Sequence, residues 1–226
     1  MLEKIAIIAD IHSNLHALEA VLEDMEKHSP STVLCAGDIV GYGAYPKECI
    51  TVVKKVCAKV IAGNHDVACV TGDVRYFNPY AARACLWTKN VLGKEEKEYL
   101  LSLSRRTRMG DILMVHGSPR DDDEYIYPWD VDEELVRACE CKTLIMAHTH
   151  VPFVLRVSGT LVINPGSVGQ PRDRNWKASY AIASLKKGEV VDALIIRVNY
   201  DVDAAYEAII DAGLPKELGE RLYYGV

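Results

Sequence analysis

No stretch of this 226-residue sequence approaches the roughly 20 consecutive apolar residues that a membrane-spanning helix requires. The chain also has no excess of positive charge, because 32 Asp and Glu residues outnumber 26 Lys and Arg residues and the formal net charge is −6. A general basic field that would attract nucleic acid is therefore missing. We expect the first strand to begin at about Glu3, which leaves no room for a signal peptide. These features predict a cytoplasmic protein with no membrane partner, for which nucleic acid could serve only as a substrate.

The cysteines do not form the pattern of a disulfide framework. There are seven of them, an odd number, and they are scattered through mostly apolar or helical contexts. Cys139 and Cys141 stand too close together for a zinc knuckle or a redox pair, and we interpret them as two small residues near the end of a helix. Reduced thiols are the expectation for the whole chain.

Histidine, in contrast, is concentrated in short polar clusters, each of which follows an apolar run typical of a β-strand. Five of the seven histidines lie in these clusters, while His16 and His28 are expected to be ordinary helix residues. Because the carboxyl ends of strands in an α/β sheet share one edge, the clusters can converge on a single site. The clusters are Asp10-Ile11-His12, Gly37-Asp38, Gly63-Asn64-His65-Asp66, His116-Gly117 and His148-Thr149-His150.

Together the clusters predict a metal centre, and a two-metal centre in particular. A single Asp or His after a strand is usually a turn former or a helix cap, but five such clusters support one another. The two side chains of Asp10 and His12, or of His148 and His150, lie on the same side of an extended backbone, so that both can reach one ion. Imidazole nitrogens without any thiolate suit two divalent ions of the group Mn, Fe, Co, Ni and Zn better than Mg.

The order of these clusters resembles the signature of the calcineurin-like metallophosphoesterases. The segment from Asn164 to Arg172 is similar to that of the small prokaryotic phosphodiesterases of the superfamily, and the resemblance extends from about residue 5 to about residue 185. The chain departs from the pattern at Ala147, where glycine usually precedes the His-Thr-His. It also lacks, after Gly37-Asp38, the arginine that protein Ser/Thr phosphatases carry there, which argues against a phosphoprotein substrate.

The resemblance implies a division of the ligands between two ions, with Asp38 as the bridging residue. A hydroxide shared between the ions would attack phosphorus, since two cations acidify a bound water. One ion would be held by Asp10, His12, Asp38 and His150, and the other by Asp38, Asn64, His116 and His148.

Several further residues are candidates for binding the substrate or transferring a proton to it. His65 has no ligand duty in this scheme, so it is a candidate general acid, with Asp66 as its orienter, although a capping or structural histidine is the alternative. Arg172 and Arg174 are candidates for a phosphate clamp, or are surface charges. Tyr42 and Tyr45 could stack on a nucleobase, but packing is the more ordinary use of such side chains.

The pattern of elements predicts one domain over residues 1–226. A βαβαβ unit is expected up to Asn64, followed by a helical insert at about 78–103 and a strand-rich remainder that ends in two helices. The predicted fold class is α/β, a four-layer α/β-β/α sandwich of two mixed sheets, and the resemblance implies the same fold. The expected strands are 4–9, 32–36, 58–62, 106–109, 111–115, 143–147, 152–157, 160–164, 178–185 and 190–197, and the expected helices are 14–28, 46–55, 131–140, 202–212 and 215–220.

The leading hypothesis for function is a hydrolase of phosphodiester bonds. A phosphomonoesterase and a dinucleoside polyphosphate hydrolase are the alternatives within the same chemistry. A protein-binding scaffold, such as the retromer subunit that shares the fold implied by the resemblance, is an alternative of another class, but it predicts missing ligands and none is missing here. The sequence leaves open the physiological substrate, the native metal, the pathway and the oligomeric state.

Overall fold

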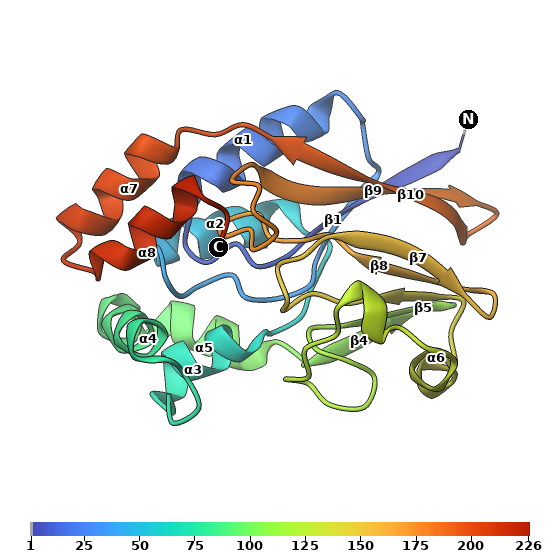
Figure 1. The fold of residues 1–226 in the computed structure, drawn as a ribbon, viewed down its shortest axis with the longest axis horizontal. Coiled ribbons are helices and arrows are strands. Elements are labelled where there is room, and N and C mark those ends of the chain that lie inside the picture. Colours follow the sequence, from blue (N-terminus) through green and yellow to red (C-terminus); the bar gives the residue numbers. More distant parts are fainter. Residues whose placement is uncertain (1) are drawn as a thin grey trace.

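Two five-stranded sheets lie face to face at the centre of the structure, a computed structural model that describes residues 2–226 (Figure 1). The first sheet has the strand order β10-β9-β1-β2-β3, in which β1, β2 and β3 are parallel and β9 runs antiparallel to both β1 and β10. Its elements are β1 (Glu3–Ile8), α1 (Leu15–Glu26), β2 (Thr32–Cys35), α2 (Pro46–Val56), β3 (Lys59–Val60), β9 (Ala178–Lys186) and β10 (Glu189–Val198).

The second sheet has the order β4-β5-β6-β8-β7, with three parallel strands in its middle and an antiparallel strand at each edge. Both sheets are therefore mixed, and with helices on their outer faces they confirm the predicted fold class. The elements of this half are β4 (Arg106–Met109), β5 (Ile112–Val115), η1 (Pro128–Asp130), α6 (Glu133–Cys139), β6 (Thr143–Ile145), β7 (Phe153–Val157) and β8 (Thr160–Asn164).

Strand β1 shows how the apolar runs fill two cores at once. Successive side chains of a strand point to opposite faces, so Ile5 and Ile7 pack between the two sheets, whereas Ala6 and Ile8 face the helices outside the first sheet. All four side chains are buried. A strand covered on both faces has to be apolar at every position, which explains why this run lacks the alternation of a surface strand.

The remaining helices gather at one end of the molecule, where the ligand-bearing loops also emerge. Figure 1 shows α3 (Asn64–Thr71), α4 (Pro79–Val91) and α5 (Lys94–Ser102) below α7 (Val202–Asp211) and α8 (Lys216–Glu220) in this view. Helix α3 was not predicted, because its eight residues carry no clear apolar periodicity. After α8 the chain continues into η2 (Arg221–Tyr223), a short 3₁₀ helix. Within residues 2–226, no helix combines the length and apolar composition needed to cross a bilayer.

Side chains at the helix starts explain several element boundaries. Asn14 accepts a hydrogen bond from the backbone N–H of Ala17, and Asn78 accepts from Tyr80 and Ala81 at the start of α4. Such caps satisfy backbone N–H groups that have no partner inside the helix. Asn14 lies only two residues after the expected ligand His12, so the cap of α1 also fixes the loop that carries the first cluster.

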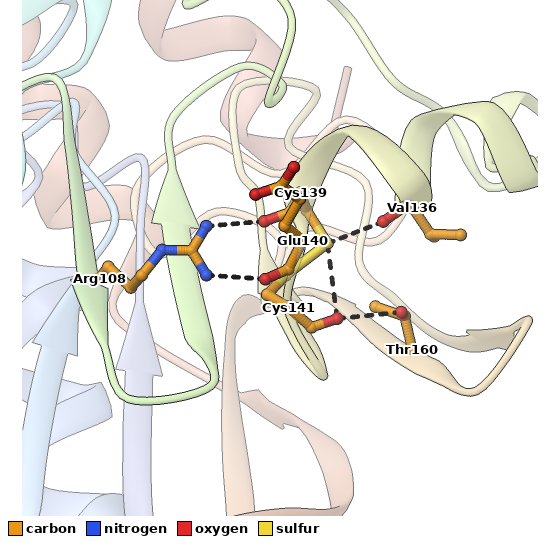
Figure 2. The surroundings of a disulfide bond; sticks show 6 residues. All are labelled: Arg108, Val136, Cys139, Glu140, Cys141 and Thr160. Carbon is orange, nitrogen blue, oxygen red and sulfur yellow. Dashed lines mark hydrogen bonds between the residues drawn. A yellow bond between two sulfur atoms is a disulfide. The ribbon is translucent and has the colours of Figure 1, made fainter.

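A disulfide between Cys139 and Cys141 contradicts the expectation of reduced thiols (Figure 2). Helix α6 ends at Cys139, and Glu140 adopts a left-handed conformation with φ of 46°, which turns the chain back and leaves the two Cα atoms 5.3 Å apart. That separation is within the usual range for a disulfide. The Arg108 side chain donates hydrogen bonds to the carbonyls of Cys139 and Glu140, at 2.7 and 3.0 Å, and so holds the turn. The other five cysteines are free.

Candidate metal centre

The loops after five strands bring all the predicted metal ligands to one place between the two sheets. Asp10 and His12 follow β1, Asp38 follows β2, and Asn64 begins α3 just after β3. The second sheet contributes His116 after β5 and the pair His148 and His150 after β6. Asn64 is half-buried and the other six are buried. Ligands from both sheets therefore share one buried site.

The first group of ligand atoms belongs to Asp10, His12 and His150, which lie within 4.8 Å of one another. The Nδ1 atoms of the two histidines contact backbone carbonyls, that of His12 on Val40 at 3.2 Å and that of His150 on Gln170 at 2.5 Å. Because a carbonyl only accepts, each Nδ1 carries the proton and each Nε2 carries a lone pair. These two Nε2 atoms face each other at 3.1 Å.

The second group consists of Asp38, His116 and His148, also within 4.8 Å. Nδ1 of His116 donates to the carbonyl of Ala36 at 2.8 Å, while its Nε2 lies 3.4 Å from Oδ2 of Asp38 and 3.2 Å from Oδ1 of Asn64. Oδ2 of Asp38 also lies 3.6 Å from Nε2 of His12 in the first group. Asp38 thus stands between the two groups, where a bridging ligand would stand.

The polar atoms of both groups fit cations better than they fit one another. Oδ1 of Asp10 and Oδ2 of Asp38 are buried without a hydrogen-bond partner among the described residues. Unpartnered buried carboxylate oxygens are costly, and so are two imidazole lone pairs that point at each other. Divalent cations that accept these oxygen and nitrogen atoms would remove both costs. The ligand atoms of a third group, His12, Asp38 and His65, also lie within 4.8 Å of one another.

The backbone of the ligand loops is strained. Asp10, His12, Asp38, His148 and His150 all have φ between 50° and 68°, in the left-handed region that side chains other than glycine rarely adopt. Each such residue costs of order 1–3 kcal/mol and persists only where the surroundings hold it in place. Here the N–H groups of Asp10 and His12 donate to the carbonyls of Gly37 and Asp38, each at 3.0 Å. The strain marks these loops as functional, because stability alone would favour glycine there.

The segment that suggested small phosphodiesterases holds the loops together. Nδ2 of Asn164 donates to the carbonyl of Ala147 at 2.9 Å and to the hydroxyl of Thr149 at 3.0 Å, so it fixes the loop that carries His148 and His150. The Ser167 hydroxyl donates to the carbonyl of Asp10 at 2.7 Å. The segment therefore links a ligand loop of the first sheet to one of the second.

Burial and charge shift the acid–base properties of the ligands in opposite directions. Burial raises the pKa of Asp10 to about 7. Burial alone would lower the pKa of His116, but the negative charges of Asp38 and Asp10 outweigh it and raise that pKa to about 9. Burial, reinforced by the charge of His116, lowers the pKa of His148 to about 3. Near neutral pH, protons on Asp10 and His116 therefore compete with cations for the same atoms.

Asp66 does not orient His65, contrary to the expectation from sequence. One carboxylate oxygen of Asp66 accepts from the backbone N–H groups of Ile39 and Val40 at 2.9 and 3.1 Å, and the other accepts from Gly63 at 3.0 Å. Asp66 is fully buried and ties the loop after β2 to the start of α3. It is thus a structural residue of the site.

The partner of His65 is Cys85, which sequence reasoning missed. Nδ1 of His65 lies 3.4 Å from Sγ of Cys85, a buried residue of α4. Burial lowers the pKa of His65, but the charge of Asp38 and the contact with Cys85 outweigh it and leave that pKa above its usual value. Contacts with Cys69 and His65 lower the pKa of Cys85 to about 6 against the effect of burial. No local motif marks Cys85, because its contact depends on how α4 packs on α3.

The two arginines predicted as a phosphate clamp lie in different surroundings. Arg172 donates to the Tyr42 hydroxyl at 3.2 Å and to Oε1 of Gln170 at 3.1 Å, beside the first ligand group. Arg174 is exposed, and its side chain makes no ion pair within the described chain. The structure instead brings Arg221, which sequence reasoning missed, to within 6.0 Å of the centre of the Tyr42 ring.

An open cleft of about 700 Å³ lies beside the ligands. Asn64, His65 and His148 line its inner end, and side chains of α3, the segment 73–78 and the segment 122–125 form its walls. The volume is in the range of sites for small molecules. Because His65 is part of the lining, a group departing from a substrate into this cleft would leave next to an imidazole.

Comparisons with known proteins agree with this geometry. A family model described as the calcineurin-like phosphoesterase superfamily domain matches residues 4–188. An uncharacterized protein of Methanocaldococcus jannaschii is 39% identical over 98% of each chain, and a probable metallophosphoesterase of Mycoplasma pneumoniae is 25% identical over 84% of this chain and 94% of its own. The crystal structure of a metallophosphoesterase from Sphaerobacter thermophilus superposes with a TM-score of 0.88 at 38% identity and covers 100% of both chains.

Proposed function

The chain belongs to the calcineurin-like phosphoesterase superfamily and is a metallophosphoesterase, a hydrolase of phosphoester bonds, and we propose that its substrates are phosphodiesters. We further propose that it binds two divalent transition-metal ions. The observation that carries the second proposal is the pair of buried ligand groups that share Asp38. In this assignment Asp10, His12, Asp38 and His150 hold one ion, and Asp38, Asn64, His116 and His148 hold the other.

The residues around the ions have separate tasks. Bound ions would supply an acidified water as nucleophile and would neutralise charge on the phosphoryl oxygens. His65 holds a proton for the leaving oxygen, in keeping with the direction of its pKa shift and its place in the cleft. Because Cys85 occupies Nδ1, the nitrogen of His65 available for proton transfer is Nε2. A positioned general acid of this kind is worth about 10²–10⁴-fold in rate.

The preference for diesters rests on the residues that follow Asp38. Ile39 and Val40 are completely buried and apolar, so no cation stands where protein phosphatases place an arginine against the extra charge of a monoester. The cleft offers room for a substituent of nucleotide size. A phosphomonoesterase and a dinucleoside polyphosphate hydrolase remain the alternatives, and the following experiment separates them.

Metal-stripped protein reloaded separately with Mn, Fe, Co, Ni or Zn should be assayed with bis-p-nitrophenyl phosphate, p-nitrophenyl phosphate, cyclic nucleotides and dinucleoside polyphosphates. We expect a higher kcat/KM for diesters than for monoesters, together with close to two ions per chain by elemental analysis. Asp38→Asn should lose metal and activity for every substrate, whereas Asp211→Asn, the same change at an exposed position of α7, should lose neither. A monoester preference would transfer the assignment to the first alternative, and full activity with one ion per chain would contradict the two-metal mechanism.

A further inference from the structure

Two arginines from distant parts of the chain meet at one tyrosine beside the metal centre. The Cζ atom of Arg172 lies 5.8 Å from the centre of the Tyr42 ring, and the Cζ atom of Arg221 lies 6.0 Å from it. Arg172 belongs to the loop between β8 and β9, whereas Arg221 is the first residue of η2, near the last residue described. The fold therefore gathers two guanidinium groups where no local motif requires them.

No Asp or Glu side chain of the described residues balances these two positive charges. Across residues 2–226, neither Arg172 nor Arg221 forms an ion pair within 4.0 Å, whereas Arg105, Arg106, Arg120 and Arg197 each do. Arg221 donates through Nε to a main-chain oxygen of Val226, the last residue described, and Nε of Arg172 is buried without a hydrogen-bond partner among residues 2–226. Like charges held together in partly buried surroundings destabilise a protein unless an anion compensates them.

The pKa of Arg221 agrees with this lack of a nearby negative side chain. Burial and then the positive charge of Arg172 lower the pKa of Arg221 from its ordinary value. The faces of aromatic rings attract guanidinium groups, but a ring carries no net charge and offsets only part of the repulsion. The missing partner is therefore an anion that contacts both groups, and phosphate is the anion whose geometry matches the planar fork of arginine.

We propose that Arg172, Arg221 and the Tyr42 hydroxyl form a binding site for a second phosphate group of the substrate, distinct from the phosphate that is hydrolysed. This inference rests on the proposed phosphodiesterase function. Neither arginine lines the cleft that contains His65, although Tyr42 does. The leaving group thus departs on the cleft side, and the second phosphate belongs to the part of the substrate that stays attached to the scissile phosphorus.

Arg172 and Tyr42 both lie next to residues that are proposed metal ligands. Its backbone N–H lies 3.3 Å from the carbonyl of His150, one of the proposed ligands, and Tyr42 contacts the His12 ring with centroids 4.7 Å apart. The Tyr42 hydroxyl accepts from Arg172 and so keeps its own proton to donate. A phosphate held there would be a near neighbour of the hydrolysed one, as in a nucleoside bisphosphate or a phosphoanhydride chain.

The test compares two substrates that share one leaving group. Thymidine 5′-(p-nitrophenyl phosphate) has a single phosphate, and its 3′-phosphorylated form carries a second one on the retained sugar. We expect the wild type to show a lower KM for the second substrate. Arg221→Gln should raise that KM about tenfold, as expected for a charged hydrogen-bond partner, and should change the KM of the first less than about twofold. Arg221→Lys, which keeps the charge but loses the fork, should be intermediate.

Arg137→Gln provides the matched control, because Arg137 is exposed on α6 and pairs only with Glu133. Hydrolysis of diadenosine tetraphosphate by the same variants tells whether the second phosphate comes from an anhydride chain or from a sugar, and a selective loss with either substrate supports the site. Equal weakening of both thymidine substrates by Arg221→Gln would mean that Arg221 binds the hydrolysed phosphate, and would overturn the inference. So would a wild type that gains nothing from the second phosphate.

A binding measurement separates failure of this inference from failure of the proposed function. The protein as purified is titrated calorimetrically with thymidine 3′,5′-bisphosphate and with thymidine 5′-monophosphate. We expect tighter binding of the bisphosphate, and loss of that difference in Arg221→Gln, whose melting temperature should be no lower than that of the wild type. If no diester is hydrolysed but this difference is found and then lost, the second-phosphate site stands while the phosphodiesterase assignment falls. If both nucleotides bind equally to the wild type, the site is refuted.

Discussion

Gly63→Ala tests whether the exact position of Asp38 determines metal binding. A Cβ atom built on Gly63 would overlap Oδ1 of Asp38 and would lie 2.6 Å from both Cγ and the backbone N of that residue. Because nonbonded carbon atoms prefer separations of about 3.5–4.0 Å, the carboxylate has to retreat by roughly 1 Å. That movement would break its 2.9 Å hydrogen bond from the N–H of His65 and would shift the oxygen that faces His116.

The expected cost is modest for folding and severe for function. Overpacking of this kind typically destabilises by about 1–3 kcal/mol, which for a chain of this length lowers Tm by roughly 2–12 °C. A misplacement of about 1 Å in a catalytic site costs about 10²-fold in rate. Thermal melts, metal analysis and kcat/KM measure the three effects. Gly93→Ala is the control, since its Cβ would meet only the flexible end of Glu96. Two bound ions and control-like activity in Gly63→Ala would refute the reasoning.

Three further outcomes are expected. His65→Asn should keep the metal content of the wild type but lower kcat for nucleotide diesters about 10²–10⁴-fold. The loss should be much smaller for p-nitrophenyl esters, because their leaving group needs no proton. Equal losses for both kinds of substrate would exclude His65 as the general acid. Cys85→Ala should move the alkaline limb of the pH–activity profile to lower pH and so reduce activity at pH 8, because the contact with Cys85 raises the pKa of His65. An unshifted profile, like that expected of Cys49→Ala, would remove Cys85 from this role. Metal binding at pH 7 should release about one proton per chain, chiefly from His116, whose pKa is about 9, and metal affinity should rise as the pH increases from 7 to 9. Calorimetry in two buffers of different ionisation enthalpy measures the number of protons released. Metal binding without proton release would contradict the prediction.

The parts of the fold that could be predicted from the sequence are those that local patterns encode. Strand β1 was expected at 4–9 and is found at Glu3–Ile8, and the parallel pairing of β1, β2 and β3 follows from the short helical connections between them. Strand β3 is shorter than the expected 58–62. The N–H of Ile61 still donates to the carbonyl of Cys35 in β2 at 3.1 Å, but the N–H of Ala62 donates to the carbonyl of Ser104 at 2.9 Å, outside the sheet.

The parts that could not be predicted depend on contacts between distant segments. Nothing in the local sequence shows that Arg221 reaches Tyr42, or that Cys85 reaches His65. Asp66 lies beside His65 in sequence, yet its side chain accepts from two buried N–H groups of another loop, those of Ile39 and Val40, and from the N–H of Gly63 at the start of its own helix. The Cys139–Cys141 bond depends on one left-handed residue, and propensity alone does not predict such a conformation.

The proposed ligands come from both sheets, so the metal site exists only in the folded protein. The supply of metal should therefore affect how much of the protein stays folded. A ligand that binds only the folded state stabilises it, by about 2.7 kcal/mol when present at a hundred times its dissociation constant. The loops that carry Asp10 and His116 follow strands of different sheets and meet only in the folded chain, so the unfolded chain has no such site to offer. The free metal concentration would then set how much folded protein is present, because molecules without metal would unfold more often and be degraded by proteases, and would not simply remain as inactive enzyme.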